Sequence, residues 1–436
     1  MGSDLVAVII LAAFIIVGFT RPAVATCAVV WVDLYKPQIL SFSFLSGKPI
    51  SMIIVAYCFL IYLICQKKLS FPRRRAYVVL MPLFMAWITI TTMRALFPEA
   101  AWIKHDFAFK TMLVTLLIPF AIQNRSQFEL LLWTIFCALG YFMFSSGIKS
   151  VFGGGGYNVA LITSPRGIYW DEGSTLAAQS IAMIPIIVYL AKYSMMAASK
   201  PWLRKFLWLV AASGVLLLVG TQARTGLVTL AFLVLLYFLY SRHKLRIGMV
   251  VLLIPILALP FMPSAWTDRM STIFSSNEDS SAVGRLLVWR WTIDFANRNP
   301  VFGGGFHAYL ANAGQLTDYQ EHDEADIFME KAKAYHNIFF EVLGEHGYVG
   351  LIIFLLIIGH TYKILIGYYR NPGSEDWQRS FGLLGMMSIT TFCVGGMFIG
   401  VAFSPWIYLM YAIAVSFDNA NYAKRKESPQ SGNLTS

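Results

Sequence analysis

The stretch FLWLVAASGVLLLVGTQARTGLVTLAFLVLLYFLY (residues 206–240) consists of two long apolar runs joined by the turn Thr221–Arg224. With its weakly polar flanks, each run approaches the roughly 17–22 residues that a helix needs to cross ~30 Å of hydrocarbon. Arg224 is the charged residue of this stretch, and it opens the second run. The pattern predicts two adjacent membrane helices with a cation at a depth where a charge is costly.

The rest of the chain repeats this apolar character. Apolar residues make up 57% of the sequence and charged residues 13%, whereas soluble domains have about 45–50% and about 25%. Further apolar blocks are Leu5–Val17, Met52–Cys65, Val78–Ile90, Met249–Leu259 and Leu351–Ile358. We therefore predict an all-α membrane protein with about twelve spans and one polytopic domain over residues 1–436. The five cysteines lie in or beside apolar stretches, so neither disulfides nor a cysteine metal site is expected.

The positions of lysine and arginine predict which ends of the membrane helices face the cytoplasm. Dense basic clusters lie at residues 67–75, 192–205, 242–246, 363–379 and 424–426, and the positive-inside rule places them in the cytoplasm. The segments between them then pair as outgoing and returning helices: 76–96 with 107–122, 127–148 with 175–192, 206–220 with 224–240, 247–262 with a helix ending near 366, and 381–396 with 404–417.

The first 66 residues are less regular. Apolar segments occur at 5–19, 23–31 and 50–65, but 23–31 is too short to span alone. We interpret it as re-entrant or interfacial, with a third span as the alternative. Both termini are expected on the cytoplasmic side, and residues 424–436 form a cytoplasmic tail.

The outward loops are then 97–106, the glycine-rich 152–173, the turn 221–224 and the long 263–335. The last is the large periplasmic loop, inserted between late membrane helices, and 284–298 within it is expected to be helical. The formal charge of +11 is better explained by cytoplasmic loops and an anion site than by nucleic acid.

Several basic residues break the positive-inside pattern because they map to the outer side. They are Arg94, Lys104, Lys110, Arg166, Arg224, Arg285 and Arg290. Cations that converge at one depth suit a multiply charged anion such as a pyrophosphate, and arginine binds phosphate oxygens bidentately. Solvated or snorkelling charges are the favoured interpretation for Lys104 and Arg290. Both interpretations stay open for Lys110 and Arg94, whereas Arg224 is the hardest to explain in this way.

His336 lies where the outer loop becomes helix, in the segment Ala334–Phe340. A neutral imidazole there could accept a proton from an attacking hydroxyl, although a helix cap or a packed ring is the favoured alternative for this residue alone. His322, Asp323, Glu324 and Asp326 could hold a divalent cation, but a solvated acidic face is favoured. We therefore predict no metal site.

Three of these pieces occur together in a recognisable order. Thr221–Gly226 opens a span, Gly284–Trp289 precedes Asn299–Gly305, and His336-Asn337 is followed by Glu345, Gly347 and Gly350. This set resembles the O-antigen ligase and polymerase superfamily of bacterial envelope glycosyltransferases over about residues 207–417. Residues 21–37 are also similar to the start of a subgroup of probable O-glycosylation ligases.

The resemblance implies a GT-C-like fold of twelve helices, with a large periplasmic loop and a lipid-lined cavity open to the outer leaflet. Such enzymes of the bacterial inner membrane move a glycan en bloc from undecaprenyl pyrophosphate to a hydroxyl, which in ligases belongs to lipid A-core. They use neither a nucleotide sugar nor a metal or other cofactor, and nucleic acid is not a partner.

The resemblance also implies site residues. His336 matches the essential histidine, and Arg224 and Arg285 match the two basic positions. Arg166 matches less securely. We expect the pyrophosphate or glycan to contact Arg166, Arg94, Lys110, Arg290 and Asn337.

The residues favour a one-step, inverting displacement, because no outer carboxylate clearly suits a covalent intermediate. An O-antigen polymerase or a protein O-oligosaccharyltransferase would use the same donor with another acceptor. A transporter of lipid-linked glycans is the non-enzyme alternative. It should show internal repeats and functional charges near the middle of the bilayer.

Overall fold

The computed structural model describes residues 2–152, 156, 161–162, 172–245, 248–249, 253, 266–267, 280–319 and 331–427. The regular elements in these residues are helices. The longer ones are α1 (Gly2–Gly18), α2 (Pro22–Tyr35), α4 (Ile50–Ile64), α5 (Arg75–Met93), α6 (Pro98–Ala121), α7 (Arg125–Val151), α8 (Gly173–Tyr193), α10 (Pro201–Thr221), α11 (Arg224–Tyr240), α14 (Ser280–Arg298), α15 (Ile338–Arg370), α16 (Asp376–Gly396) and α17 (Pro405–Glu427). The shorter ones include α3 (Pro37–Leu40), α9 (Met195–Ser199), η4 (Ala308–Asn312) and η5 (Leu316–Tyr319).

Among these, α5, α7, α8, α10 and α15 are long and apolar enough to cross a membrane. Shorter apolar helices occupy Asp4–Gly18, Ile50–Ile64 and Arg224–Tyr240. The chain is thus a helical membrane protein, as its composition predicts. The described helices do not establish the predicted total of about twelve spans, and most of the predicted span 247–262 lies outside the described residues.

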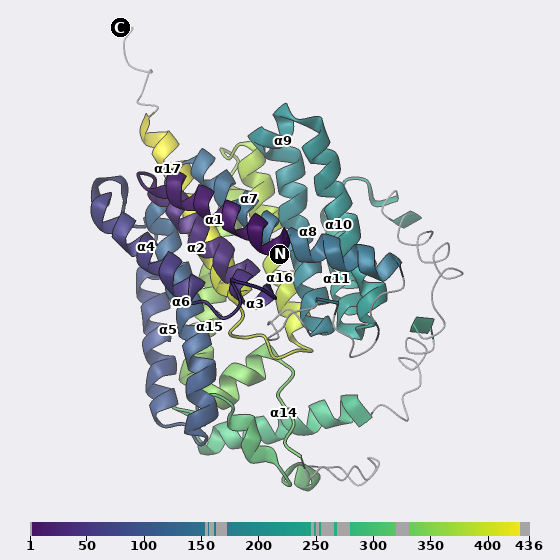
Figure 1. The fold of residues 1–436 in the computed structure, drawn as a ribbon. Coiled ribbons are helices and arrows are strands. Elements are labelled where there is room, and N and C mark those ends of the chain that lie inside the picture. Colours follow the sequence, from purple (N-terminus) through teal and green to yellow (C-terminus); the bar gives the residue numbers. More distant parts are fainter. Residues whose placement is uncertain are drawn as a thin grey trace, which may run out of the picture.

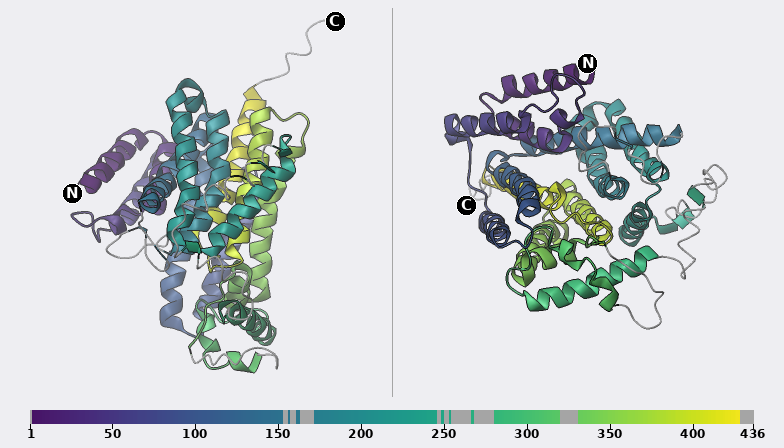
Figure 2. Two further views of the ribbon diagram at one scale, coloured as in Figure 1. Left: turned by 90° about the vertical axis from the view of Figure 1, so that its right-hand side faces the viewer. Right: turned by 60° about the horizontal axis from the view of Figure 1, so that its bottom comes forward.

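Helices α5, α6, α8, α10, α11 and α15–α17 run roughly parallel and form an upright bundle (Figures 1 and 2). Helix α17 is buried on every face between Trp406 and Phe417, because it packs against α6, α7, α15 and α16. Helix α8 is almost as deeply buried. A helix that is apolar all round belongs in the interior, so α8 and α17 form the core around which the lipid-facing helices pack.

The first helices are arranged differently. Helices α1 and α4 are tilted against the bundle (Figure 2), and α2 is buried between α1, α4, α6 and α7. At 14 residues, α2 is only about 21 Å long, so it is indeed too short to cross ~30 Å of hydrocarbon.

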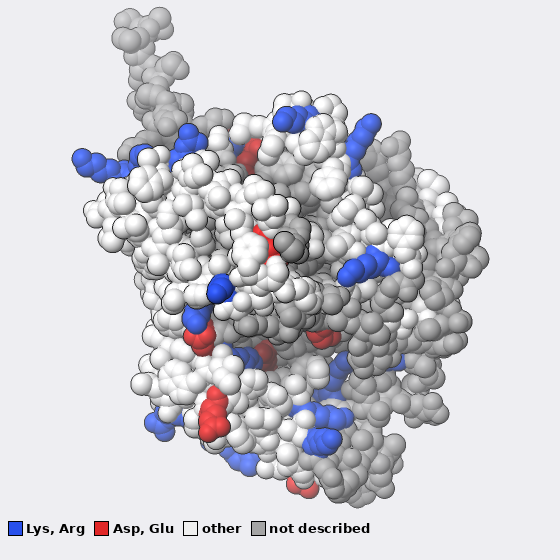
Figure 3. All heavy atoms as spheres, in the orientation of Figure 1, with Lys and Arg blue, Asp and Glu red and all other residues white. Residues whose placement is uncertain are grey.

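The two ends of the bundle differ in charge. Helices α5, α7 and α10 begin, and α8, α11 and α15 end, at what we call the basic end, where Arg74 forms two 2.9 Å hydrogen bonds to Asp418 of α17. Figure 3 shows basic side chains along the upper edge of the molecule, and basic and acidic side chains together over its lower part. We call the opposite end, where α8, α11 and α15 begin, the site end.

The start of α1 does not lie at the basic end. Asp4 lines the same cavity as Lys149, which is near the last residue of α7 at the site end. Helix α17 finishes at the basic end instead, beside Arg73 and Arg74. This differs from the expectation that both termini lie on the cytoplasmic side.

Below the bundle, α14 crosses the site end almost horizontally (Figure 1). It packs with η4 and η5 around a small core that includes Leu287, Trp291 and Tyr335. The helix predicted for 284–298 is confirmed within α14. The loop predicted for 97–106 is wrong, because α6 already begins at Pro98 and continues the helix by two further turns.

Candidate active site

The beginnings of α8, α11 and α15 meet around the last turn of α16. A Cβ placed on Gly395 would lie 2.9 Å from both Ala178 of α8 and Thr229 of α11, and one on Gly396 would lie 2.6 Å from Ile338 of α15. The amide of Asn337 donates to the Met397 carbonyl at 3.3 Å. Small residues at the end of α16 therefore allow the other helices to approach closely.

This arrangement points helix N-termini toward one region. Each N-terminus carries a partial positive charge, and the unpaired N–H groups of its first turn favour anions. At α8 the carboxylate of Glu172 caps the N–H groups of Ser174 and Thr175 at 3.0 and 2.7 Å. Helix α11 has no side-chain cap at Ala223.

His336 is held in place by contacts around it. Its φ of 46° puts it in the left-handed region, directly before the Asn337 cap of α15. Trp289 of α14 donates from Nε1 to the Tyr335 carbonyl at 2.9 Å and stacks on Phe340 with ring centroids 5.3 Å apart. Helix α14 therefore fixes the residues on both sides of His336, while the imidazole itself remains exposed.

The surroundings of His336 lower the pKa of its imidazole. Desolvation by neighbouring protein atoms has the largest effect, and the positive charge of Arg285 acts in the same direction. The carboxylates of Glu172 and Glu341 oppose the shift, and Lys333 adds to it. The imidazole is thus kept neutral near pH 7, the form that accepts a proton.

The two predicted arginines are placed at this end. Arg285 is half-buried in α14 and is close enough to His336 to affect the pKa of its ring. Arg224 is half-buried as the first residue of α11. It lies three residues after Thr221, and a Cβ placed on Gly173 at the start of α8 would lie 3.3 Å from the Thr221 side chain. The fold thus brings Arg285 and His336 together and places Arg224 beside the start of α8.

The other predicted contacts are placed less centrally. Arg94 is exposed at the end of α5 and stacks on Phe302 at 4.5 Å. Arg290 donates from Nη1 to the Tyr319 carbonyl at 3.2 Å. Lys110 forms an exposed 2.6 Å pair with Asp106, one turn away on α6.

Asn337 has a structural role in the described contacts. Its side-chain oxygen accepts from the N–H groups of Phe339 and Phe340 at 2.9 and 3.4 Å. The substrate contact that we expected for Asn337 stays a prediction. Arg166 and the acidic residues 322–326 lie outside the described residues.

The sequence interpretation missed a buried charge cluster next to this site. The ammonium of Lys104 bonds to Glu341 Oε1 at 2.7 Å and to the two oxygens of Glu345 at 2.8 and 2.9 Å. Glu341 also accepts from the Ala402 N–H, and Glu345 from the His307 N–H, each at 2.9 Å. The interpretation of Lys104 as a solvated charge is therefore wrong.

A signal for this cluster exists in the sequence. Glu341 and Glu345 are four residues apart in the helix that follows His336, and that spacing puts two carboxylates on one helical face. Two carboxylates on one face of an apolar helix predict a nearby cation, because a buried charge is costly unless it is paired. Nothing local identifies Lys104 as that cation, because it precedes Glu341 by 237 residues.

Two family models match the chain. Residues 207–355 match the family described as O-antigen ligase, and residues 2–195 match a family of unknown function, DUF5935. No curated protein matches the chain. Arg224, Arg285 and His336 lie in the first of these segments, whereas Glu172 and Lys104 lie in the second, so both contribute to the site end.

Proposed function

Because residues 207–355 match the O-antigen ligase family, we propose that the chain is a ligase that transfers a glycan en bloc from undecaprenyl pyrophosphate to a hydroxyl of lipid A-core oligosaccharide. The observation that carries the proposal is the grouping of His336 and Arg285 with the N-termini of α8, α11 and α15, at the end of the bundle opposite the basic clusters. In this proposal the basic end faces the cytoplasm of a bacterium, and the site end faces the periplasm across the inner membrane.

The proposed reaction is one displacement. The acceptor oxygen attacks the anomeric carbon, the bond from that carbon to the phosphate oxygen breaks, and the lipid pyrophosphate leaves with its electron pair. His336 takes the proton of the acceptor hydroxyl. Attack opposite the leaving group inverts the configuration at the anomeric carbon.

The cations and the helix N-termini would act on the leaving group. Negative charge grows on the pyrophosphate as the bond breaks, and donors fixed in advance around that position stabilise the transition state. Arg224 and Arg285 supply planar donor pairs that match two phosphate oxygens. The start of α11, which has no side-chain cap, adds partial positive charge without adding a mobile side chain.

The test is transfer by purified protein in lipid bilayers, with a lipid-linked glycan and lipid A-core. We expect His336→Ala to lower kcat by about 10²–10⁴ while donor binding survives. Arg224→Ala and Arg285→Ala should each lower it by about 10²–10³, and Arg→Lys should recover little because lysine lacks the planar fork.

His243→Ala and Arg242→Ala are matched controls, because both residues are exposed at the basic end, and each should transfer at the wild-type rate. Full activity of His336→Ala would refute the assignment of the base. Transfer to a growing glycan, or to a protein hydroxyl, in place of lipid A-core would identify a polymerase or a protein O-oligosaccharyltransferase with the same donor. Movement of the lipid-linked glycan across the bilayer without transfer would identify a transporter.

A further inference from the structure

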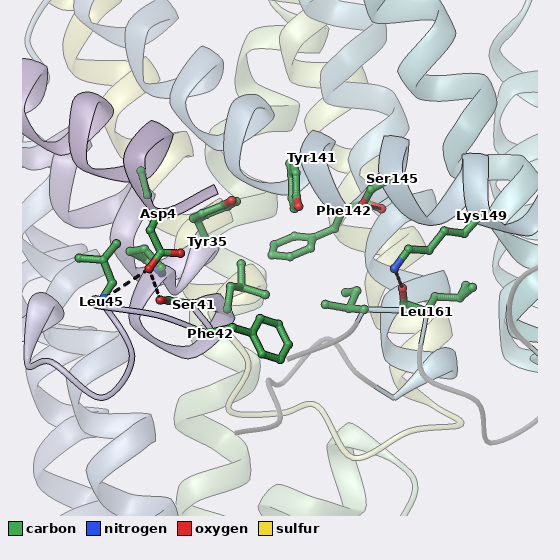
Figure 4. Close-up of a pocket in the computed structure, with 14 residues that line it drawn as sticks. Asp4, Tyr35, Ser41, Phe42, Leu45, Tyr141, Phe142, Ser145, Lys149 and Leu161 are labelled. Atoms are coloured by element: carbon green, nitrogen blue, oxygen red, sulfur yellow. Dashed lines mark hydrogen bonds between the residues drawn. The ribbon is translucent and has the colours of Figure 1, made fainter. Parts of the chain in front are cut away.

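A separate cavity of about 190 Å³ lies between α1, α3, the outer part of α7 and residues 161–162 (Figure 4). None of the proposed catalytic residues lines it. It belongs wholly to the segment that matches a family of unknown function. The volume is several times the ~30 Å³ share of one water molecule, yet it is below the ~300 Å³ of a typical pocket for a drug-sized ligand.

One wall of this cavity is aromatic. Tyr35 stacks on Trp31 at 4.8 Å and meets the edge of Tyr141 at 5.2 Å, so its ring is held from two sides. Phe42 lies across the cavity from these rings (Figure 4) and is 68% exposed. Flat rings with electron-rich faces attract C–H groups that carry partial positive charge.

The remaining walls are polar. The Asp4 carboxylate is 2% exposed and accepts hydrogen bonds from Ser41 and Ser43. Opposite it, the ammonium of Lys149 donates to the Leu161 carbonyl at 2.7 Å, and an ammonium has three donors in all. Figure 4 shows the acidic and basic groups at the two ends of the cavity, with the tyrosines between them.

This lining selects among ligand classes. A phosphate would meet the carboxylate of Asp4 as well as the one ammonium, so its charge is poorly matched. An acyl chain would leave the buried polar groups facing hydrocarbon, which is costly. A ring with hydroxyl groups on its rim and C–H groups on its faces matches both the polar ends and the aromatic wall.

We propose that this cavity binds one sugar ring of a glycan substrate, an inference that rests on the proposed function. The outer loop connects the cavity with the candidate active site. Gly156 donates to the Gly220 carbonyl at 2.9 Å, close to Arg224, and Leu161 lines the cavity. Five residues span at most about 18 Å, so one extended glycan can reach from the anomeric carbon to the cavity.

The binding test uses the full chain in lipid nanodiscs and saturation-transfer NMR. The probes are free glucose, galactose, mannose, rhamnose and N-acetylglucosamine, each tested separately. We expect signal from at least one sugar. Phe42→Ala and Tyr141→Ala should weaken that binding by about five- to tenfold, since each removes an aromatic contact. Phe42 is the milder change because its side chain is largely exposed.

Phe19→Ala is the matched control, because Phe19 is a 55% exposed ring at the other end of α1, and it should bind the sugar as the wild type does. The binding measurement does not depend on transfer, and His336→Ala should keep the signal. Sugar binding without any transfer would therefore leave the cavity proposal standing and refute the proposed function. Transfer without any sugar signal, or an unchanged signal in Phe42→Ala and Tyr141→Ala, would refute the cavity proposal.

Kinetics of Phe42→Ala then identify the source of the sugar. A higher KM for the lipid-linked glycan alone assigns the ring to the donor, and a higher KM for lipid A-core alone assigns it to the acceptor. Unchanged KM values for both substrates would refute the proposal that the cavity holds part of a substrate.

Discussion

The pKa of His336 is set by desolvation, which has the largest effect, and by charges on several elements. Charged groups from separate elements affect the pKa of its ring. They are Arg285 of α14, Lys333 in the loop that precedes His336, Glu172 at the start of α8 and Glu341 of α15. Desolvation and the cations prevail, so the pKa of His336 is lowered from its ordinary value of 6.5. Because a general base must be neutral, His336 can act as a base at a lower pH than a histidine with the ordinary pKa.

This shift predicts the pH profile of kcat. Activity should fall as the pH drops through the pKa of His336, and that acid limb should lie below pH 6.5. Lys333→Gln removes a positive charge, so the pKa should rise and the limb should move to higher pH. Glu172→Gln removes a negative charge and should move it to lower pH. Rate profiles from pH 5 to 8 test this directly, and a limb that neither substitution moves would contradict His336 as the base.

Lys104 shows a different use of charge. Its side chain is 19% exposed, and it contacts the buried carboxylates of Glu341 and Glu345 and the rings of Phe306 and Phe403. Removal of one partner from a buried ion pair leaves an uncompensated charge. Lys104→Met should therefore lower the free energy of unfolding by about 3–5 kcal/mol, measured by denaturant unfolding in detergent micelles.

Lys110→Met is the matched control, because the Lys110–Asp106 pair on the same helix is exposed. It should change the free energy of unfolding by at most about 1 kcal/mol. Addition of Glu341→Gln and Glu345→Gln to Lys104→Met should restore part of the lost stability, since no buried charge then remains. Equal effects of Lys104→Met and Lys110→Met would show that the cluster is not buried in the folded protein.

At the scale of elements, α15 is two helical segments joined at Gly347. The φ and ψ of Gly347 are 66° and −172°, a region that is essentially restricted to glycine. The bend lets the Tyr348 N–H donate to the Pro300 carbonyl at 2.8 Å, and Gly304 N–H donates to the Gly344 carbonyl at 3.0 Å. The bend thus docks the loop after α14 onto the helix that begins beside His336.

Gly347→Ala should break this docking. The new methyl group would lie 2.4 Å from the Val301 carbonyl oxygen and 2.7 Å from that of Pro300, in addition to the strained φ. We expect a loss of at least about 2 kcal/mol in the free energy of unfolding, and slower transfer because His336 shifts.

Gly367→Ala is its control. Gly367 lies in the same helix with nothing within 4 Å of an added methyl group, so stability should be unchanged or up to about 1 kcal/mol higher. Thermal unfolding of both variants in detergent makes the comparison. A Gly347→Ala protein as stable as Gly367→Ala would mean that α15 is not bent at this point.

The helices that the sequence marks most clearly are those with apolar runs and polar ends. Helices α5, α7, α8 and α11 begin and end within about three residues of their predicted limits, and α10 begins five residues before its predicted start. Helix α6 was placed nine residues too late, because Glu99, Lys104 and Asp106 made its first turns resemble an exposed loop. Burial of Lys104 against α15 makes those turns compatible with a helix, and only tertiary contacts provide that burial.

For the whole molecule, the proposal depends on the two ends of the bundle facing opposite compartments. Lys200 is exposed at the basic end, and Lys331 is exposed close to His336. In a chain without its native cysteines, Lys331→Cys should react with a membrane-impermeant maleimide in intact cells, and Lys200→Cys should react only after the cells are broken. Reaction of both residues in intact cells, or of Lys200→Cys alone, would contradict the proposed orientation.

The sequence by itself determined that the protein lies in a membrane, and it selected the candidate site residues. Apolar runs long enough to cross a bilayer require helices, because backbone groups in hydrocarbon must bond within their own segment. Arg224 and Arg285 are recognisable because they lie on the outer side, against the positive-inside rule. His336 is recognisable from the order of the motifs around it. These are local properties of the chain, and they can be found in it without any contact being known.

Only the tertiary structure decided which charges meet. The pairs of Lys104 with Glu341 and Glu345 join residues 237 and 241 positions apart, and Asn337 and Lys110 acquired partners that their sequence context does not reveal. The cost of a buried charge depends on its partner and on the water excluded around it. Both are set by how α6, α14 and α15 pack together, and this packing distinguishes Lys104 in the interior from Lys110 on the surface of the same helix.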